Sequence, residues 1–118
     1  NPSGEIGGSL DGGGLALSGK GSIAESLILK TLAKHLQKFQ YCYEKALLTN
    51  ASLAGHLMMK WTINPDGGTL GIEVVRSQLN YNPLHQCVSS ELSRIHFPSP
   101  SGGAVTVKYP FTFSSTSI

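Results

Sequence analysis

The chain has 118 residues, a formal net charge of +2 and 40% hydrophobic residues, which together indicate one small globular domain. So weak a charge argues against nucleic acid as a partner, because such proteins carry a basic stripe. No apolar run approaches the roughly 20 residues that a membrane-spanning helix needs. The first residue is Asn1 rather than Met, so we expect a fragment of a longer protein or a processed product, and a membrane anchor, if the parent protein has one, lies outside this sequence.

The first 21 residues are rich in glycine and poor in large apolar side chains. Such a segment buries too little apolar surface to offset the conformational entropy lost on ordering. We therefore predict a flexible linker over residues 1–21, in which only 15–17 could form a short strand. The glycines do not follow the spacing of a phosphate-binding loop.

A long helix is predicted over residues 24–49, a segment that contains neither glycine nor proline. Its apolar residues recur at helical period, at Ile28, Leu32, Leu36, Phe39, Tyr43 and Ala46. Two strands with alternating apolar residues follow, the first with Leu57, Met59, Trp61 and Ile63 and the second with Leu70, Ile72 and Val74. The turn residues 64–68 between them, Asn-Pro-Asp-Gly-Gly, predict a hairpin.

A second helix is predicted to begin near Pro83, because proline is favoured at the first helical position. Its buried stripe comprises Leu84, Cys87, Val88, Leu92 and Ile95. After a Pro- and Gly-rich loop, a last strand alternates apolar and other residues from Val105 to Phe113. We expect residues 114–118 to be a frayed tail.

These elements follow the order helix, strand, strand, helix, strand. Each strand has one apolar face and each helix has one apolar stripe, which two packed layers would bury. We therefore predict an α+β domain over residues 22–113, in which two helices pack on one face of a three-stranded antiparallel sheet.

The two cysteines, Cys42 and Cys87, lie on the core-facing stripes of the two predicted helices. Neighbouring helices on one sheet face could bring the thiols together, and a disulfide closing so long a loop would contribute roughly 4 kcal/mol in the chain-entropy model. Two buried free thiols are the alternative, since these are common in cytosolic proteins.

No constellation of catalytic residues is recognisable in the sequence. The histidines His35, His56, His85 and His96 show no spacing typical of metal ligands, and no histidine is placed to activate either cysteine. The few carboxylates form no recognisable acid–base pair. We therefore expect a binding domain rather than an enzyme, without a cofactor or a metal.

The last strand offers a candidate binding edge. Pro110 cannot donate to a central ladder, which suggests an edge strand, and Lys108 is typical of edges protected against aggregation. An exposed edge can accept an extended peptide as an additional strand, although these residues could equally serve only to block aggregation. The candidate partner-binding residues are Val105, Thr106, Val107, Lys108, Tyr109, Pro110 and Phe111.

A series of short motifs then suggests a family. They are, in order, Cys42-Tyr43-Glu44 with Ala46-Leu47, Leu53-Ala54-Gly55, Ile63-Asn64-Pro65-Asp66-Gly67, residues 84–88, Phe97-Pro98-Ser99-Pro100, and Gly102-Gly103 leading to Tyr109-Pro110-Phe111. Their order and spacing over about residues 23–113 resemble the TonB C-terminal domain family. More narrowly, the chain resembles the AgmX/PglI-type C-terminal domain of gliding-motility and other delta-proteobacterial envelope proteins.

The resemblance implies a periplasmic domain at the end of an inner-membrane-anchored chain. TonB captures a short peptide of an outer-membrane transporter by strand addition next to its last strand, which here would be residues 105–111. The implied partner is therefore an envelope protein or a peptide of an outer-membrane protein. In the motility-type relatives the two cysteines look paired, which implies a Cys42–Cys87 disulfide. An alternative role is a structural or self-association module of an envelope or motility complex, which would form a homodimer.

Overall fold

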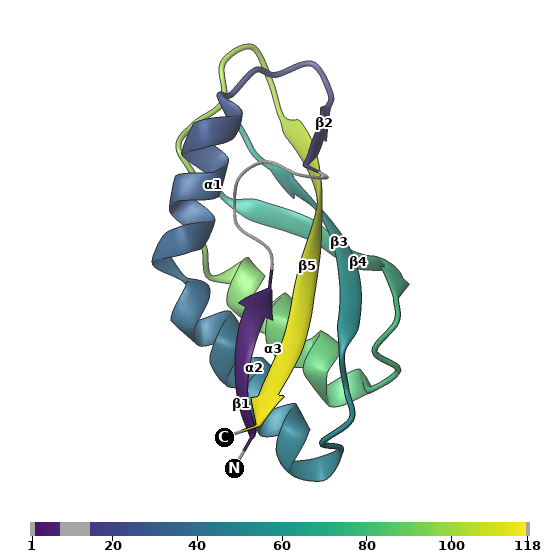
Figure 1. The fold of residues 1–118 in the computed structure, drawn as a ribbon. Coiled ribbons are helices and arrows are strands. Elements are labelled where there is room, and N and C mark those ends of the chain that lie inside the picture. The colour runs from purple at the N-terminus through teal and green to yellow at the C-terminus, as the bar shows by residue number, and fades with distance from the viewer. Residues whose placement is uncertain (1, 8–14, 118) are drawn as a thin grey trace.

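The structure is a computed structural model that describes residues 2–7 and 15–117, with side chains described for residues 15–113. Three helices and five strands succeed one another along these residues (Figure 1). In chain order they are β1 (Pro2–Gly7), β2 (Ala16–Ser18), α1 (Glu25–Lys34), α2 (Leu36–Thr49), β3 (Gly55–Ile63), β4 (Thr69–Ser77), α3 (Asn82–Ser93) and β5 (Val105–Ser117). No helix in this part of the chain is both long and apolar enough to cross a membrane.

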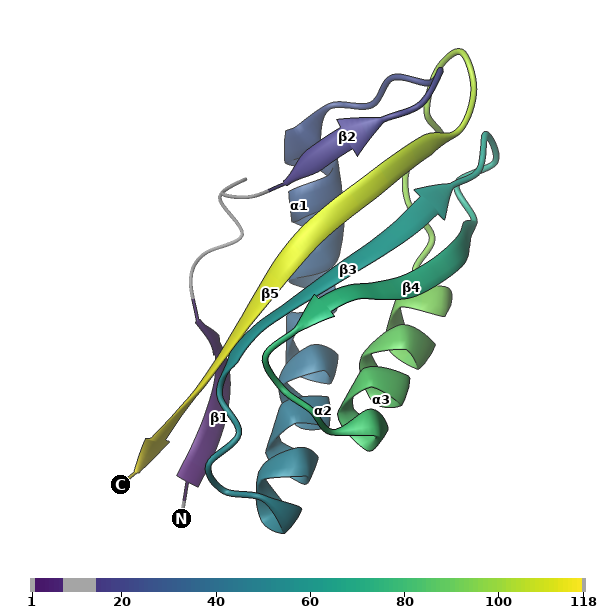
Figure 2. The ribbon, with the colours of Figure 1, turned by 90° about the vertical axis from the view of Figure 1, so that its right-hand side faces the viewer.

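The strands form one antiparallel sheet in the order β1-β5-β3-β4, and β2 also pairs with β5. All three helices lie on one face of this sheet (Figure 2). The predicted α+β class with helices on a single sheet face is therefore confirmed. The sheet has two more strands than expected, and both of them come from the glycine-rich segment.

The first predicted helix is two helices, because the backbone departs from helical geometry at His35. The amide of His35 donates to the carbonyl of Leu32 at 3.0 Å, which is a tighter turn than the α-helical bond to the fourth residue back. One turn earlier, the hydroxyl of Thr31 donates to the carbonyl of Leu27 at 2.8 Å. A hydrogen bond from a threonine hydroxyl to the carbonyl four residues back bends a helix. The spacing of apolar residues does not reveal such a bend, so the sequence predicted one continuous helix.

The core lies between the helices and the covered sheet face. The predicted inward-facing residues of β3 and β5 are all buried, namely Leu57, Met59, Trp61, Ile63, Val105, Val107, Tyr109, Phe111 and Phe113. Helix α2 packs on them through aromatic contacts. The ring of Phe39 lies 5.0 Å from that of Phe111, and the ring of Tyr43 lies 4.9 Å from that of Phe113. The buried Tyr43 hydroxyl donates to the carbonyl of Leu53.

The disulfide between Cys42 and Cys87 is present and joins α2 to α3. The two Cα atoms lie 5.7 Å apart, within the range that a disulfide spans. Cys42 is buried and Cys87 is half-buried. The disulfide therefore holds α2 and α3 together on the helix-covered face of the sheet.

The predicted hairpin joins β3 to β4. The amide of Asn64 donates to the carbonyl of Gly68 at 2.8 Å, and Gly67 adopts a φ of 92°, which favours glycine. The Gly67 carbonyl also accepts from the amide of Phe97 at 2.9 Å, which anchors the turn to the segment after α3.

The glycine-rich segment is not wholly a linker. Residues 2–7 and 16–18 of it are strands on β5, and β5 itself continues through Ser117, where a frayed tail was expected. This segment has few apolar side chains to bury, but pairing with β5 gives its backbone amides and carbonyls hydrogen-bond partners. In addition, Leu15, Leu17 and Ile23 pack against the core. Residues 8–14 of the predicted linker, with residues 1 and 118, lie outside the described residues.

Candidate functional site

The predicted binding strand, residues 105–111, forms the first half of β5. On one side it pairs with β3 in continuous register, from Ile63 opposite Val105 to Gly55 opposite Phe113. The only side that could receive another strand is therefore the one facing away from β3.

The side chains of these seven residues divide between the two faces of the sheet. Those of Val105, Val107, Tyr109 and Phe111 are buried against the helices. The other three, Thr106, Lys108 and Pro110, are half-buried or exposed. Because four of the seven predicted binding residues are core residues, a partner would be held at this edge mainly by main-chain hydrogen bonds, as in strand addition generally.

This edge is not empty. Strand β2 pairs with it antiparallel, with Ala16 opposite Lys108, Leu17 opposite Val107 and Ser18 opposite Thr106. Further along, β1 pairs with β5 from Gly7 opposite Thr112 onward. The expectation that the last strand is an outer strand is therefore wrong over these stretches. Figure 1 shows β1 beside β5 on the side away from β3, and Figure 2 shows the same for β2.

The segment after β2 is also fixed to the start of β5. The amide of Gly21 donates to the carbonyl of Ala104 at 3.0 Å. Ser22 and Ser101 exchange two backbone hydrogen bonds of 2.7 and 2.9 Å. A Cβ atom at Gly21 would lie 2.0 Å from the carbonyl oxygen of Gly103, so only glycine permits this close approach.

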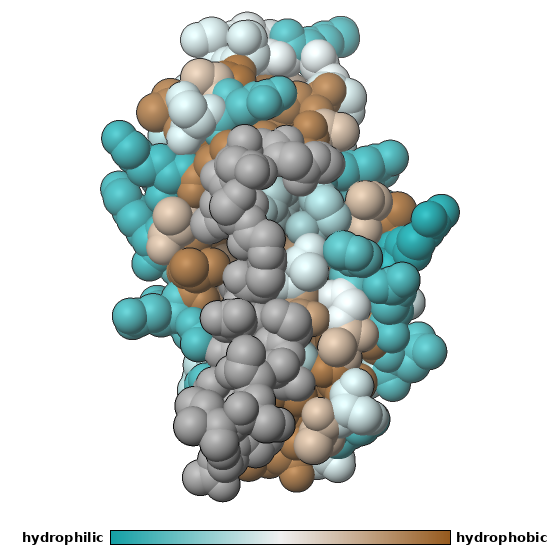
Figure 3. Space-filling view, viewed as in Figure 1, coloured by the Kyte–Doolittle hydropathy of each residue, from teal (hydrophilic) through white to brown (hydrophobic). Residues whose placement is uncertain are grey.

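The surface around this edge is mixed in character. Seen from the β5 side, hydrophilic residues gather along both margins of the molecule, and hydrophobic residues lie nearer its middle (Figure 3). The sheet face away from the helices carries polar pairs beside exposed Leu70. There Lys60 pairs with Glu73 at 3.4 Å, and the hydroxyls of Thr62 and Thr106 lie 3.3 Å apart.

Strand β4 forms the opposite edge, which the sequence reasoning did not consider as a site. Among the described strands it pairs with β3 alone. It exposes Leu70 (45%), Val75 (44%) and Val74 (37%). Its pairing with β3 shifts register twice, and such bulges twist an edge in a way that discourages further pairing. No signal in the sequence indicated this exposed apolar surface, because the alternation of apolar residues predicted that Leu70 and Val74 face the core.

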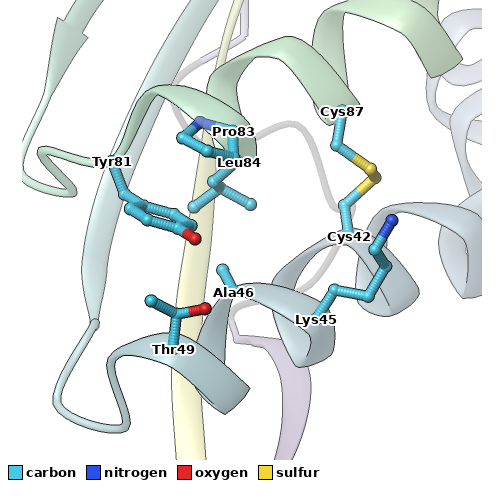
Figure 4. A pocket seen from close by; sticks show the side chains of 8 residues that line it. All are labelled: Cys42, Lys45, Ala46, Thr49, Tyr81, Pro83, Leu84 and Cys87. Carbon is cyan, nitrogen blue, oxygen red and sulfur yellow. A yellow bond between two sulfur atoms is a disulfide. The ribbon is translucent and has the colours of Figure 1, made fainter.

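A groove of about 210 Å³ lies between α2 and α3, over the disulfide. Figure 4 shows its lining, which comprises Cys42, Lys45, Ala46, Thr49, Tyr81, Pro83, Leu84 and Cys87. The two sulfur atoms are bonded to each other, so neither is a thiol nucleophile. Lys45 lies over the ring of Tyr41, 5.5 Å from its centroid. The lining offers no acid–base pair, so nothing in the groove indicates catalysis.

The histidines are dispersed. His85 Nε2 lies within hydrogen-bonding distance of the Leu79 carbonyl (2.7 Å) and the Ser77 hydroxyl (2.9 Å), which fixes the loop before α3. His56 Nδ1 lies 2.9 Å from the Thr112 hydroxyl on the neighbouring strand. Over residues 2–7 and 15–117, no three His, Cys, Asp or Glu side chains come together to hold a metal ion.

Comparison of the sequence with models of protein families gives no match, and neither does comparison with curated proteins. Among solved structures, the fold is similar to the NMR solution structure of the Helicobacter pylori TonB C-terminal domain. The TM-score is 0.55, with 20% sequence identity, and the similarity covers 82% of this chain and 85% of that one. At this identity the similarity concerns the fold, and it confirms the TonB C-terminal-like architecture expected from the motifs.

Proposed function

We propose that this chain is a protein-binding adaptor domain of a TonB-like envelope protein, which captures an extended segment of a partner by strand addition at the β5 edge. The observation that carries the proposal is the pairing of β2 with Thr106, Val107 and Lys108. This pairing supports the proposal, because a short antiparallel strand lies on this side of β5 while residues 105–113 pair with β3 on the other side.

The proposed partner is an envelope protein or a peptide of an outer-membrane protein. The disulfide supports an oxidising compartment such as the periplasm, because cytosolic thiols are kept reduced. The parent chain would be anchored in the inner membrane and would belong to the AgmX/PglI type, with a role in gliding motility or in energy transduction. The domain would act by binding, without catalysis and without a cofactor.

Backbone amide NMR with peptides from candidate envelope proteins tests the proposal. Strand addition should shift the amides of residues 105–111 and protect some of them from hydrogen exchange. A matched peptide with N-methyl groups on alternate backbone nitrogens should lose binding, because it keeps the side chains and loses the donors. Shifts confined to the helices, with residues 105–111 unaffected, would contradict strand addition.

The second candidate function is self-association, and the apolar side chains exposed on β4 favour it. Leu70, Val74 and Val75 expose apolar surface on a strand that pairs on one side only among the described strands. Two copies could bury these side chains against each other as a homodimer, without pairing their bulged strands. Sedimentation over a range of concentrations distinguishes the two functions, since a monomer at all concentrations eliminates self-association and leaves peptide capture intact.

A further inference from the structure

The β5 edge that we propose for partner binding is filled by the chain's own residues 16–18. A partner strand and β2 would use the same main-chain groups of Thr106, Val107 and Lys108, so both cannot be bound together. This follows from the register alone, because each side of a strand can form only one ladder.

The side chains of this internal strand match the edge. Leu15 and Leu17 are half-buried and pack against the core, whereas Ala16 and Ser18 between and after them are exposed. Gly19 follows with a φ of 107°, and a Cβ there would lie 2.8 Å from the Ala104 carbonyl oxygen. The edge thus selects an apolar residue at every second position, small residues between them, and a glycine at the end.

An open surface pocket of about 210 Å³ lies beside the internal strand, lined by Leu17, Ser18, Gly19, Gly21, Ser22, Ile23 and Val105. A ligand with a larger apolar side chain at the Leu17 position could fill part of this space. A partner that fills this space would bury more apolar surface at the edge than the internal strand does.

Leaving the edge would disturb little of the fold. Strand β2 is three residues long, and none of its residues belongs to the fully buried core. The β3–β5 ladder and the Cys42–Cys87 disulfide do not involve it. The cost of release is thus local, as in other segments that open without global unfolding.

Resting on the proposed function, we infer that residues 15–19 are an internal competitor for the partner site. They hold the β5 edge until a partner strand displaces them, and their pattern, Leu-Ala-Leu-Ser-Gly, is a template for the partner segment. The partner is accordingly an extended peptide with two apolar residues flanking a small one, followed by a small polar residue and glycine. The N-terminal segment both blocks the site and specifies its ligand class.

Four variants of the chain test the inference. Leu17→Asp places a charge on the half-buried side and should release the strand. Ser18→Asp places the same charge on the exposed side and serves as its matched control. Ala16→Cys with Lys108→Cys joins register partners and should lock the strand on the edge, whereas Ala16→Ser with Lys108→Ser cannot crosslink. Intact mass before and after digestion verifies the added crosslink beside Cys42–Cys87.

The probe is a fluorescent peptide with the sequence of residues 15–20, and the readouts are anisotropy and amide NMR. We expect Leu17→Asp to bind the probe at least tenfold more tightly than the unmodified chain, with shifts at residues 106–108. Ser18→Asp should bind like the unmodified chain, and the crosslinked variant should not bind, unlike its serine counterpart. A probe carrying Asp at the Leu17 position should fail with every variant.

The outcomes separate this inference from the proposed function. Equal binding of the probe at β5 by Leu17→Asp and by the unmodified chain would overturn competition and leave strand capture standing. If Leu17→Asp rejects the probe but accepts other extended peptides at β5, the template is wrong while strand capture again stands. If no extended peptide shifts residues 105–111 in any variant, strand capture itself fails.

Discussion

Replacing Cys42 and Cys87 together with alanine should lower the free energy of unfolding by about 4 kcal/mol. The two residues are 45 positions apart, so the disulfide closes a long loop in the unfolded chain. The chain-entropy model assigns an entropy loss of roughly 13 cal/mol/K to a loop of this length, or about 4 kcal/mol at 25 °C. For a domain of this size the melting temperature should fall by about 15 °C.

Urea denaturation followed by circular dichroism measures this loss, and a thermal melt checks it independently. Alanine is the suitable replacement at the buried Cys42, because serine would bury a hydroxyl without a partner. Reducing the unmodified chain provides a control that changes no side-chain volume. It should reproduce most of the loss, whereas the same reductant should not affect the double alanine variant.

A loss below about 1 kcal/mol on reduction would refute the reasoning, since the typical contribution of a native disulfide is about 2–4 kcal/mol. A large loss in the alanine variant with a small loss on reduction would instead assign the effect to packing around Cys42 and Cys87. In that case the bond between α2 and α3 would not be the source of the stability.

Three further changes probe the contacts described above. Gly21→Ala should detach the segment after β2, because the added Cβ meets the Gly103 carbonyl oxygen at 2.0 Å; faster hydrogen exchange of the Ser22 amide, with the β3–β5 amides unchanged, is the expected readout. Tyr43→Phe should cost about 1–3 kcal/mol in urea denaturation, because the Leu53 carbonyl loses its buried donor, and an unchanged midpoint would contradict this. Val75→Lys on the exposed β4 edge should change stability by no more than about 0.5 kcal/mol, and it should abolish any concentration-dependent sedimentation if copies associate there.

Local patterns in the sequence determine most of the central fold. The alternation of apolar residues in β3 and β5 predicts which side chains face the helices, because a strand has only two faces. The turn at residues 64–68 predicts the hairpin, and the helical stripes carry both cysteines to the same interface. The β4 residue Leu70 escapes this logic, because a register shift places it opposite Thr62 and not opposite a buried residue; Val74 lies opposite the buried Met59 but remains partly exposed at the sheet edge.

The position of the glycine-rich segment is decided only by the tertiary structure. Strand β2 lies on β5 through main-chain groups that every sequence possesses, and its partners are about ninety residues away in the chain, as with Leu17 and Val107. Composition therefore indicates a linker, while the folded sheet supplies the edge that orders part of it. The sequence by itself predicts a strand at residues 105–111 with one buried face, because its apolar residues alternate. Only the assembled sheet shows that the chain already occupies that edge, because occupancy depends on a non-local pairing between backbones.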